Sequence, residues 1–146
     1  MIEHTATIVL NARPNAVWQF IQTVDDWQKW NRRIESAERL TAGNWEPGFR
    51  FRQKSERLAF VYTVTAVELG RSAAWTGTRA GLTRGMSVEI RALEGDTEVS
   101  LRQTADGART AGPLGWFVRR GLRRSLRAWT DGLRNAVASL PVPGTE

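Results

Sequence analysis

The chain has 146 residues, of which 41% are hydrophobic and 25% are charged, a balance typical of one globular domain with a core of its own. The absence of cysteine excludes disulfides, thiolate metal ligands and a cysteine nucleophile. Because there is no apolar run of about eighteen residues and no basic-then-apolar leader, we expect one domain over residues 1–146, without a transmembrane segment and by default cytoplasmic.

The formal net charge is +6, and nineteen of the 21 basic residues are arginine. Such a charge permits binding to nucleic acid or to an anionic membrane. Arginines on a helix face are more often a solvated surface, and we prefer that interpretation. Nucleic acid is the least favoured partner.

The first elements are a strand and two short helices. Residues 4–10 are rich in β-branched side chains and predict a strand. Pro14 suits the first position of a helix, where a missing N–H group costs nothing. Asp25 is placed to cap a second short helix over residues 26–30, whose Trp27 and Trp30 are three residues apart and should point to one side.

Six further strands follow, separated by short turns that contain glycine, asparagine or aspartate. The strongest alternation of inward and outward side chains is in residues 58–68, where Phe60, Tyr62 and Val64 share a face. Short turns between consecutive strands predict an antiparallel sheet. The predicted strands cover residues 34–40, 49–54, 58–68, 72–78, 82–93 and 97–105.

Residues 111–140 predict a long amphipathic helix. Its apolar side chains recur at steps of four and three, and its arginines lie beside or opposite them. Pro141 ends the helix and leaves a flexible tail at residues 141–146. Trp116 and Phe117 lie off the apolar stripe and should pack on loops or edge a pocket. The stripe consists of Leu114, Val118, Leu122, Leu126, Trp129, Leu133, Val137 and Leu140.

Short motifs spread over nearly the whole chain carry a resemblance to a known superfamily. In their order and spacing they resemble the SRPBCC group, also called START-like or polyketide cyclase/dehydrase-like, which has the helix-grip fold. The motifs are Ala12-Arg13-Pro14 before Val17-Trp18, Asp25 with Trp27 and Trp30, Gly43 and Gly48 before Phe49, residues 64–68, Ala74-Trp75-Thr76-Gly77, Asp96-Thr97 before Val99, and Gly107 before the long helix.

The resemblance implies an α+β fold in which a seven-stranded antiparallel sheet curves around the C-terminal helix, with two short helices after the first strand. It also implies a cavity between sheet and helix for a small, mostly hydrophobic molecule. The group includes aromatic polyketide cyclases, lipid and sterol carriers, plant hormone receptors and carriers of ubiquinone-like lipids. The fold therefore does not fix the function.

Polar and aromatic residues on the predicted inner faces are the best candidates for a ligand site. A buried Tyr62 hydroxyl needs a partner, and Arg84 is costly to bury without an anion. Arg84 could instead reach water or pair with a carboxylate. We expect Trp18, Trp27, Trp30 and Trp129 to fill the core. The predicted ligand-binding residues are Phe60, Tyr62, Trp75, Arg84, Met86, Leu101, Gln103, Phe117 and Leu122.

Few residues favour catalysis. The single histidine, His4, lies on the first strand and is more typical of a structural or solvated residue than of a catalytic one. We expect no metal and no cofactor. Relatives in the subgroup carry a histidine and an acidic residue where this chain has Met86 and Gln103. That departure favours binding over acid–base catalysis.

Three hypotheses remain open. The first is a binding protein for a small hydrophobic molecule that is aromatic, polyketide-like or lipid-like. The second is a cyclase or dehydrase in which Tyr62 or Arg84 polarises a carbonyl group. The third is an interaction module whose arginine-rich helix face binds an acidic partner. The chain is expected to be a monomer or a homodimer.

Overall fold

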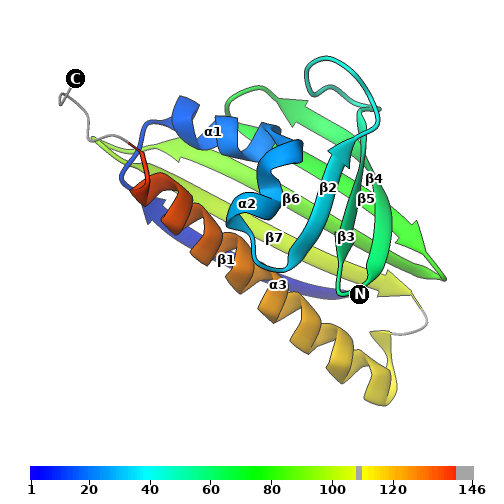
Figure 1. The fold of residues 1–146 in the computed structure, drawn as a ribbon. Coiled ribbons are helices and arrows are strands. Elements are labelled where there is room, and N and C mark those ends of the chain that lie inside the picture. The colour runs from blue at the N-terminus through cyan, green and yellow to red at the C-terminus, as the bar shows by residue number, and fades with distance from the viewer. Residues whose placement is uncertain (108–109, 141–146) are drawn as a thin grey trace.

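The computed structural model describes residues 1–107 and 110–140, so the tail expected at 141–146 lies outside these ranges. Seven strands and a long C-terminal helix form the fold, with short helices between the first two strands (Figure 1). The elements are β1 (Ile2–Leu10), α1 (Pro14–Gln22), η1 (Val24–Asp26), α2 (Trp27–Trp30), β2 (Ile34–Arg39), β3 (Arg50–Ser55), β4 (Leu58–Glu68), β5 (Ser72–Arg79), β6 (Leu82–Ala92), β7 (Thr97–Gly107) and α3 (Gly112–Ala138).

All strand pairs are antiparallel, in the order β1-β7-β6-β5-β4-β3-β2. Each strand from β2 to β7 pairs with its neighbour in the chain, whereas β1 crosses over to pair with β7, from Ile2 opposite Ala105 to Leu10 opposite Thr97. The sheet curves around α3, which lies in its concave side (Figure 1). The predicted α+β helix-grip fold is therefore confirmed.

Strand alternation determines which side chains face α3. On β4, Phe60, Tyr62 and Val64 are buried, and on β7 alternate residues from Thr97 to Ala105 are buried. These positions supply the concave face, as the period of two predicts. The outer face carries polar and charged side chains, such as the ion pair between Arg102 and Glu3 on neighbouring strands.

A cluster of aromatic rings fills the interior beneath α1 and α2. The ring of Trp27 lies 4.9 Å from Trp129 and 5.1 Å from Phe51, measured between centroids, and Trp45 lies 5.3 Å from Trp75. Trp45 comes from the turn between β2 and β3 and is only 3% exposed. Its contribution to the core was not anticipated, because a turn composition predicts exposure and carries no sign of the direction of one side chain.

The short helices are held by these rings. Core packing is confirmed for Trp18, Trp27 and Trp129, and Trp30 is partly buried against the same cluster. Trp27 and Trp30 both pack on Trp129, as their spacing predicts. The expected cap of α2 by Asp25 is wrong. The carboxylate of Asp25 instead accepts the backbone N–H of Arg39, at 3.0 Å, and so ties the helical segment to β2.

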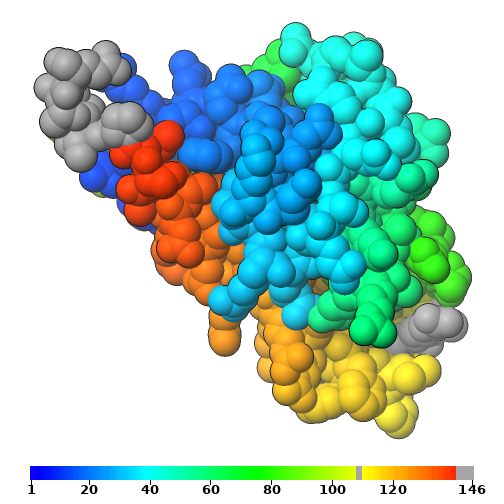
Figure 2. All heavy atoms as spheres, in the orientation of Figure 1, coloured from blue at the N-terminus to red at the C-terminus, as the bar shows by residue number. Residues whose placement is uncertain are grey.

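The apolar stripe of α3 is buried from Leu122 to Val137 but not at its beginning. Leu114 is exposed, contrary to the periodicity, because the first turns of α3 project beyond the strand ends (Figures 1 and 2). A small separate cluster of Ile2, Ala105 and Leu122, with Leu82 and Val118 beside it, anchors this half of the helix. No helix in the described part of the chain is long and apolar enough to span a membrane.

Candidate functional site

A small cavity lies between the concave face of the sheet and α3. Its volume is about 10 Å³, which is about the room that one water molecule requires. The large cavity that the resemblance implies is thus absent from the described conformation, because the tryptophan cluster fills the space. The lining residues are Gln53, Tyr62, Trp75, Arg84, Gly85, Met86, Gln103, Leu122 and Trp129.

Six of the nine residues predicted to bind a ligand line this cavity, and three do not. Phe60 lies next to it, with its ring 5.8 Å from that of Tyr62. Leu101 is fully buried in the main core, on the same face of β7 as Gln103, and Phe117 is exposed on α3. Whether any of the nine contacts a ligand remains a prediction.

One row of side chains crosses the sheet beneath α3. Trp75 is opposite Met86, Met86 is opposite Gln103, and Gln103 is opposite His4. Residues directly opposite each other in an antiparallel sheet project on the same side, so the row runs across the concave face. His4 does not line the cavity, and its Nε2 atom is buried without a hydrogen-bond partner among the described residues.

Gln103 has one satisfied and one unsatisfied polar atom. Its Nε2 donates to Ser125 Oγ of α3 at 3.0 Å, while its Oε1 is buried without a partner in the described structure. Ser125 can serve only one end of the amide, so one polar atom stays unpaired whichever way the amide is turned. A buried acceptor in this condition costs about 1–3 kcal/mol.

Tyr62 is a buried phenol held between two aromatic rings. It stacks on Phe51 at 5.5 Å and on Phe60 at 5.8 Å. Burial raises the pKa of Tyr62 above its ordinary value, and the positive charge of Arg84 opposes this in part. The hydroxyl therefore stays protonated at physiological pH and can donate a hydrogen bond.

Arg84 is a half-buried cation beside the cavity. Its guanidinium carbon lies 5.6 Å from the centroid of the Phe60 ring, in a cation–π arrangement. None of the ion pairs among the described residues includes Arg84, so no carboxylate of the described chain occupies its donors. The guanidinium can still bind an acceptor oxygen.

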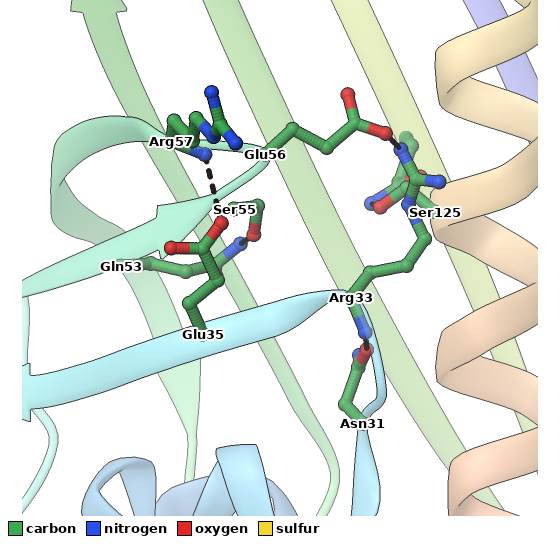
Figure 3. Close-up of polar contacts among 9 residues, drawn as sticks. Asn31, Arg33, Glu35, Gln53, Ser55, Glu56, Arg57 and Ser125 are labelled. Carbon is green, nitrogen blue, oxygen red and sulfur yellow. Dashed lines mark hydrogen bonds and ion pairs between the residues drawn. The ribbon is translucent and has the colours of Figure 1, made fainter.

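Polar contacts join the loop before β2, β2 itself and the turn between β3 and β4. Arg33 reaches from the loop before β2 to Glu56 in the β3–β4 turn and forms an ion pair with it (Figure 3). Glu56 and Arg57 have positive φ angles of 50° and 67°, which is costly for residues with a Cβ atom. The Arg33–Glu56 ion pair and the bond from the Arg57 N–H to Glu35, at 2.9 Å, stabilise this turn.

One row of α3 leads from the solvent to the cavity. Phe117, Gly121 and Ser125 are spaced by four residues and therefore share a side of the helix. Ser125 contacts Gln103, Gly121 is half-buried, and Phe117 is exposed. A Cβ atom on Gly121 would meet no atom within 4 Å. We call this row the mouth row.

The two largest of several hollows elsewhere among the described residues are open to solvent. One, of about 510 Å³, crosses the outer face of the sheet between small polar side chains such as Ser72 and Ser87. The other, of about 560 Å³, is an apolar groove between α1, α2 and the end of α3, lined by Phe20 and Trp30. Neither brings together the polar groups that the interior cavity does.

The chemistry of the interior site is limited to neutral and cationic groups. Among residues 1–107 and 110–140, neither a carboxylate nor an imidazole lines the cavity, and no three metal-ligating side chains form a cluster. Gln53 and Ser125 were missed in the sequence. Gln53 alternates with Phe51 on β3, which could have placed it on the inner face, whereas the contact of Ser125 depends on the rotation of α3.

Comparison with known proteins agrees with this architecture. A START superfamily protein from Mycobacterium smegmatis superposes with a TM-score of 0.80 at 13% identity, over 95% of this chain and 99% of that one. The protein TTHA0849 from Thermus thermophilus superposes with a TM-score of 0.77 at 15% identity, over 95% and 100%. The di-domain ARO/CYC protein BexL, from the BE-7585A biosynthetic pathway, gives 0.71 at 14% identity, over 94% of this chain and 47% of that one.

At these identities the structures show a shared fold and nothing more. A search of curated protein sequences finds no match. The family model described as polyketide cyclase / dehydrase and lipid transport matches residues 1–138. The chain therefore belongs to the polyketide cyclase/dehydrase and lipid transport family.

Proposed function

We propose that the protein binds a small hydrophobic molecule between the concave face of the sheet and the first half of α3. The observation that carries the proposal is the unpaired polar side of the cavity. Gln103 Oε1 is buried without a donor, and Arg84 has no carboxylate partner among the described residues. Buried polar groups in folded proteins are normally paired, so a ligand that pairs them would recover their lost hydrogen bonds.

The polar groups suggest the chemistry of the ligand. Gln103 Oε1 would accept a hydrogen bond from a hydroxyl group, while Arg84 and the Tyr62 hydroxyl would donate to a carbonyl or carboxylate oxygen. Phe60, Trp75 and Met86 offer apolar and aromatic walls. This combination fits an aromatic or polyketide-like molecule that carries both hydroxyl and carbonyl groups.

The site must open to admit such a molecule, because a cavity of about 10 Å³ cannot hold one. The tryptophan cluster makes the end below α1 and α2 rigid. The first half of α3 is anchored by the small cluster around Leu122, so its displacement breaks few apolar contacts. Local opening occurs where the fewest buried contacts are lost, and we expect the mouth row to move away from β4 and β6.

Substitutions at Gly121 test this entry route. Gly121→Leu places a side chain in the mouth row, where a Cβ atom meets no neighbour. We expect it to lower ligand occupancy at least tenfold without loss of fold. Gly121→Ala is the matched control. It raises helix propensity as the leucine variant does, but its single methyl group does not block entry along the mouth row. Occupancy is measured by native mass spectrometry of the purified protein, followed by organic extraction of what it carries.

The outcomes separate the alternatives. A co-purified apolar molecule that is lost in Gly121→Leu but kept in Gly121→Ala supports binding at the interior. A molecule that both variants retain equally would place the ligand elsewhere, with the apolar groove between α1, α2 and α3 as the next site to examine. If no molecule co-purifies, the same pair of variants is titrated with a fluorescent aromatic probe.

A cyclase or dehydrase activity is the second candidate, favoured by one observation. Of the described residues that line the cavity, Tyr62 alone has a hydroxyl that can give a proton, and its raised pKa keeps it protonated. Arg84 beside it would stabilise the negative charge that develops on a carbonyl oxygen. Turnover of a polyketide-like substrate that Tyr62→Phe abolishes, with KM unchanged, would establish catalysis. Binding that survives in Tyr62→Phe without turnover in the wild type supports a carrier.

A further inference from the structure

The first turns of α3 expose three large apolar side chains. Leu114, Trp116 and Phe117 are 56%, 54% and 64% exposed, and the rings of Trp116 and Phe117 contact each other edge to face at 4.9 Å. The beginning of α3, which carries them, lies at one end of the molecule (yellow in Figure 2). We call these three residues the apolar tip. A contiguous exposed patch of this kind is a sign of an interaction surface.

A row of positive charges follows the apolar tip directly. No acidic residue occurs in α3 before Asp131, and Asp131 pairs with Arg32 and Arg134. Among the described residues none of the five arginines in this part of the helix forms an ion pair, and all are exposed. We call them the arginine row: Arg119, Arg120, Arg123, Arg124 and Arg127.

Trp116 of the tip shares the outward side of α3 with part of the arginine row, whereas Leu114 and Phe117 are exposed because the first turns of the helix project beyond the strand ends. Arg120 follows Trp116 by four residues, and its guanidinium carbon lies 5.5 Å from the indole centroid. Arg124 and Arg127 continue the same side at steps of four and three. The opposite side of the helix carries the buried side chains of Leu122, Leu126 and Trp129. The outward side therefore does not pack against the core.

We propose that this surface docks the protein on an anionic lipid bilayer. A membrane surface has an apolar acyl layer beneath a layer of charged headgroups. The side chains of the apolar tip would enter the boundary of the acyl layer, and the arginine row would contact anionic headgroups. Nucleic acid fits less well, because its binding proteins stack successive bases on aromatic side chains along a basic groove, whereas the exposed aromatic rings of α3 lie together at one end of the arginine row. A second copy of the protein would present the same positive charges, so the two surfaces would repel each other. The proposal does not depend on ligand binding in the interior.

Vesicle partitioning tests the charge requirement. The full chain is sedimented with vesicles of phosphatidylcholine containing phosphatidylglycerol, and with vesicles of phosphatidylcholine alone. We expect binding only to the anionic vesicles, with loss at high salt. Arg120→Gln with Arg124→Gln should weaken it on the order of tenfold or more. The matched control, Arg13→Gln with Arg50→Gln, removes the same charge from exposed positions outside α3 and should change it little.

Tryptophan quenching tests insertion of the tip. Trp116 is the most exposed of the seven tryptophans, so bilayers of brominated lipid should quench the wild type strongly and Trp116→Phe only weakly. Equal weakening in both arginine double variants, equal binding to neutral vesicles, or quenching that Trp116→Phe leaves unchanged would each overturn the proposal. Tighter binding to a DNA duplex or single strand than to anionic vesicles would also overturn it.

Discussion

Tyr62 is the only tyrosine in the chain, so its ionisation can be followed without ambiguity. Because burial raises its pKa, phenolate absorbance in the folded protein should appear only above about pH 10, the ordinary tyrosine value. In denaturant the transition should return to that value. A folded-state midpoint at or below the ordinary value would contradict the buried position.

The same shift has a consequence for stability at high pH. A group with a raised pKa holds its proton more tightly in the folded state, so above about pH 10 the unfolded state loses the proton first and is favoured. The free energy of unfolding should therefore fall more steeply above this pH for the wild type than for Tyr62→Phe. Denaturant titrations at neutral and alkaline pH measure the difference between the two proteins.

Variants at Gln103 test whether the unpaired polar group of the site lowers the free energy of unfolding of the protein. Gln103→Leu with Ser125→Ala removes the hydrogen bond together with the unpaired Oε1, so the free energy of unfolding should stay equal or rise by about 1 kcal/mol. Ser125→Ala alone leaves the whole amide unpaired and should cost about 1–3 kcal/mol. Urea titration distinguishes them. A double variant less stable than the single one would show that the amide is structurally required.

The residue scale is where prediction from the sequence was weakest. Strand alternation placed Tyr62, Met86 and Gln103 on the inner face. It could not show that Trp45, in a turn, is buried, because glycine-rich turns carry no periodicity. Nor could it show that Gln103 is half-satisfied, since that depends on Ser125 of a helix 22 residues away in the sequence.

Within α3, two glycines should respond in opposite directions to the same substitution. Alanine is favoured over glycine in a helix by about 1 kcal/mol, and Gly121→Ala should realise part of this gain because the added Cβ meets no atom. A Cβ on Gly132 would overlap the backbone carbonyl of Trp30 and lie 2.9 Å from its ring. Gly132→Ala should therefore destabilise the protein, by about 1–3 kcal/mol. Thermal unfolding of both variants is the measurement, and stabilisation by Gly132→Ala would show that α2 and α3 are not closely packed.

At the element scale the sequence was a good guide. All seven strands and the three predicted helical segments lie where periodicity, proline and glycine placed them, because each element has an apolar face of the right period. The error at Leu114 is informative. Periodicity describes which side of a helix is apolar, but burial also needs a sheet beneath that turn, and α3 begins beyond the strand ends.

For the molecule as a whole, the interior is filled to an extent that the resemblance did not predict. Trp45→Ala should remove part of the aromatic cluster and cost about 3–5 kcal/mol of unfolding free energy, while it enlarges the interior for an aromatic probe. Trp116→Ala is the matched control, because this tryptophan is exposed and its ring contacts within the described part of the chain are with Phe117 and Arg120. Its effect on stability should stay within about 0.5 kcal/mol. Equal losses in the two variants would contradict the core position of Trp45.

The pairing of β1 with β7 also bears on how the chain folds during synthesis. Ile2 is opposite Ala105, so the first strand has no partner in the sheet until the last strand has left the ribosome. Contacts so far apart in sequence form slowly and leave an unpaired strand exposed in the meantime. The hairpins from β2 to β6 can form first, and β1 and α3 can join only after β7 completes the sheet. Residues 2–10 therefore stay an unpaired strand during that interval, and an unpaired strand is prone to pairing with a wrong partner.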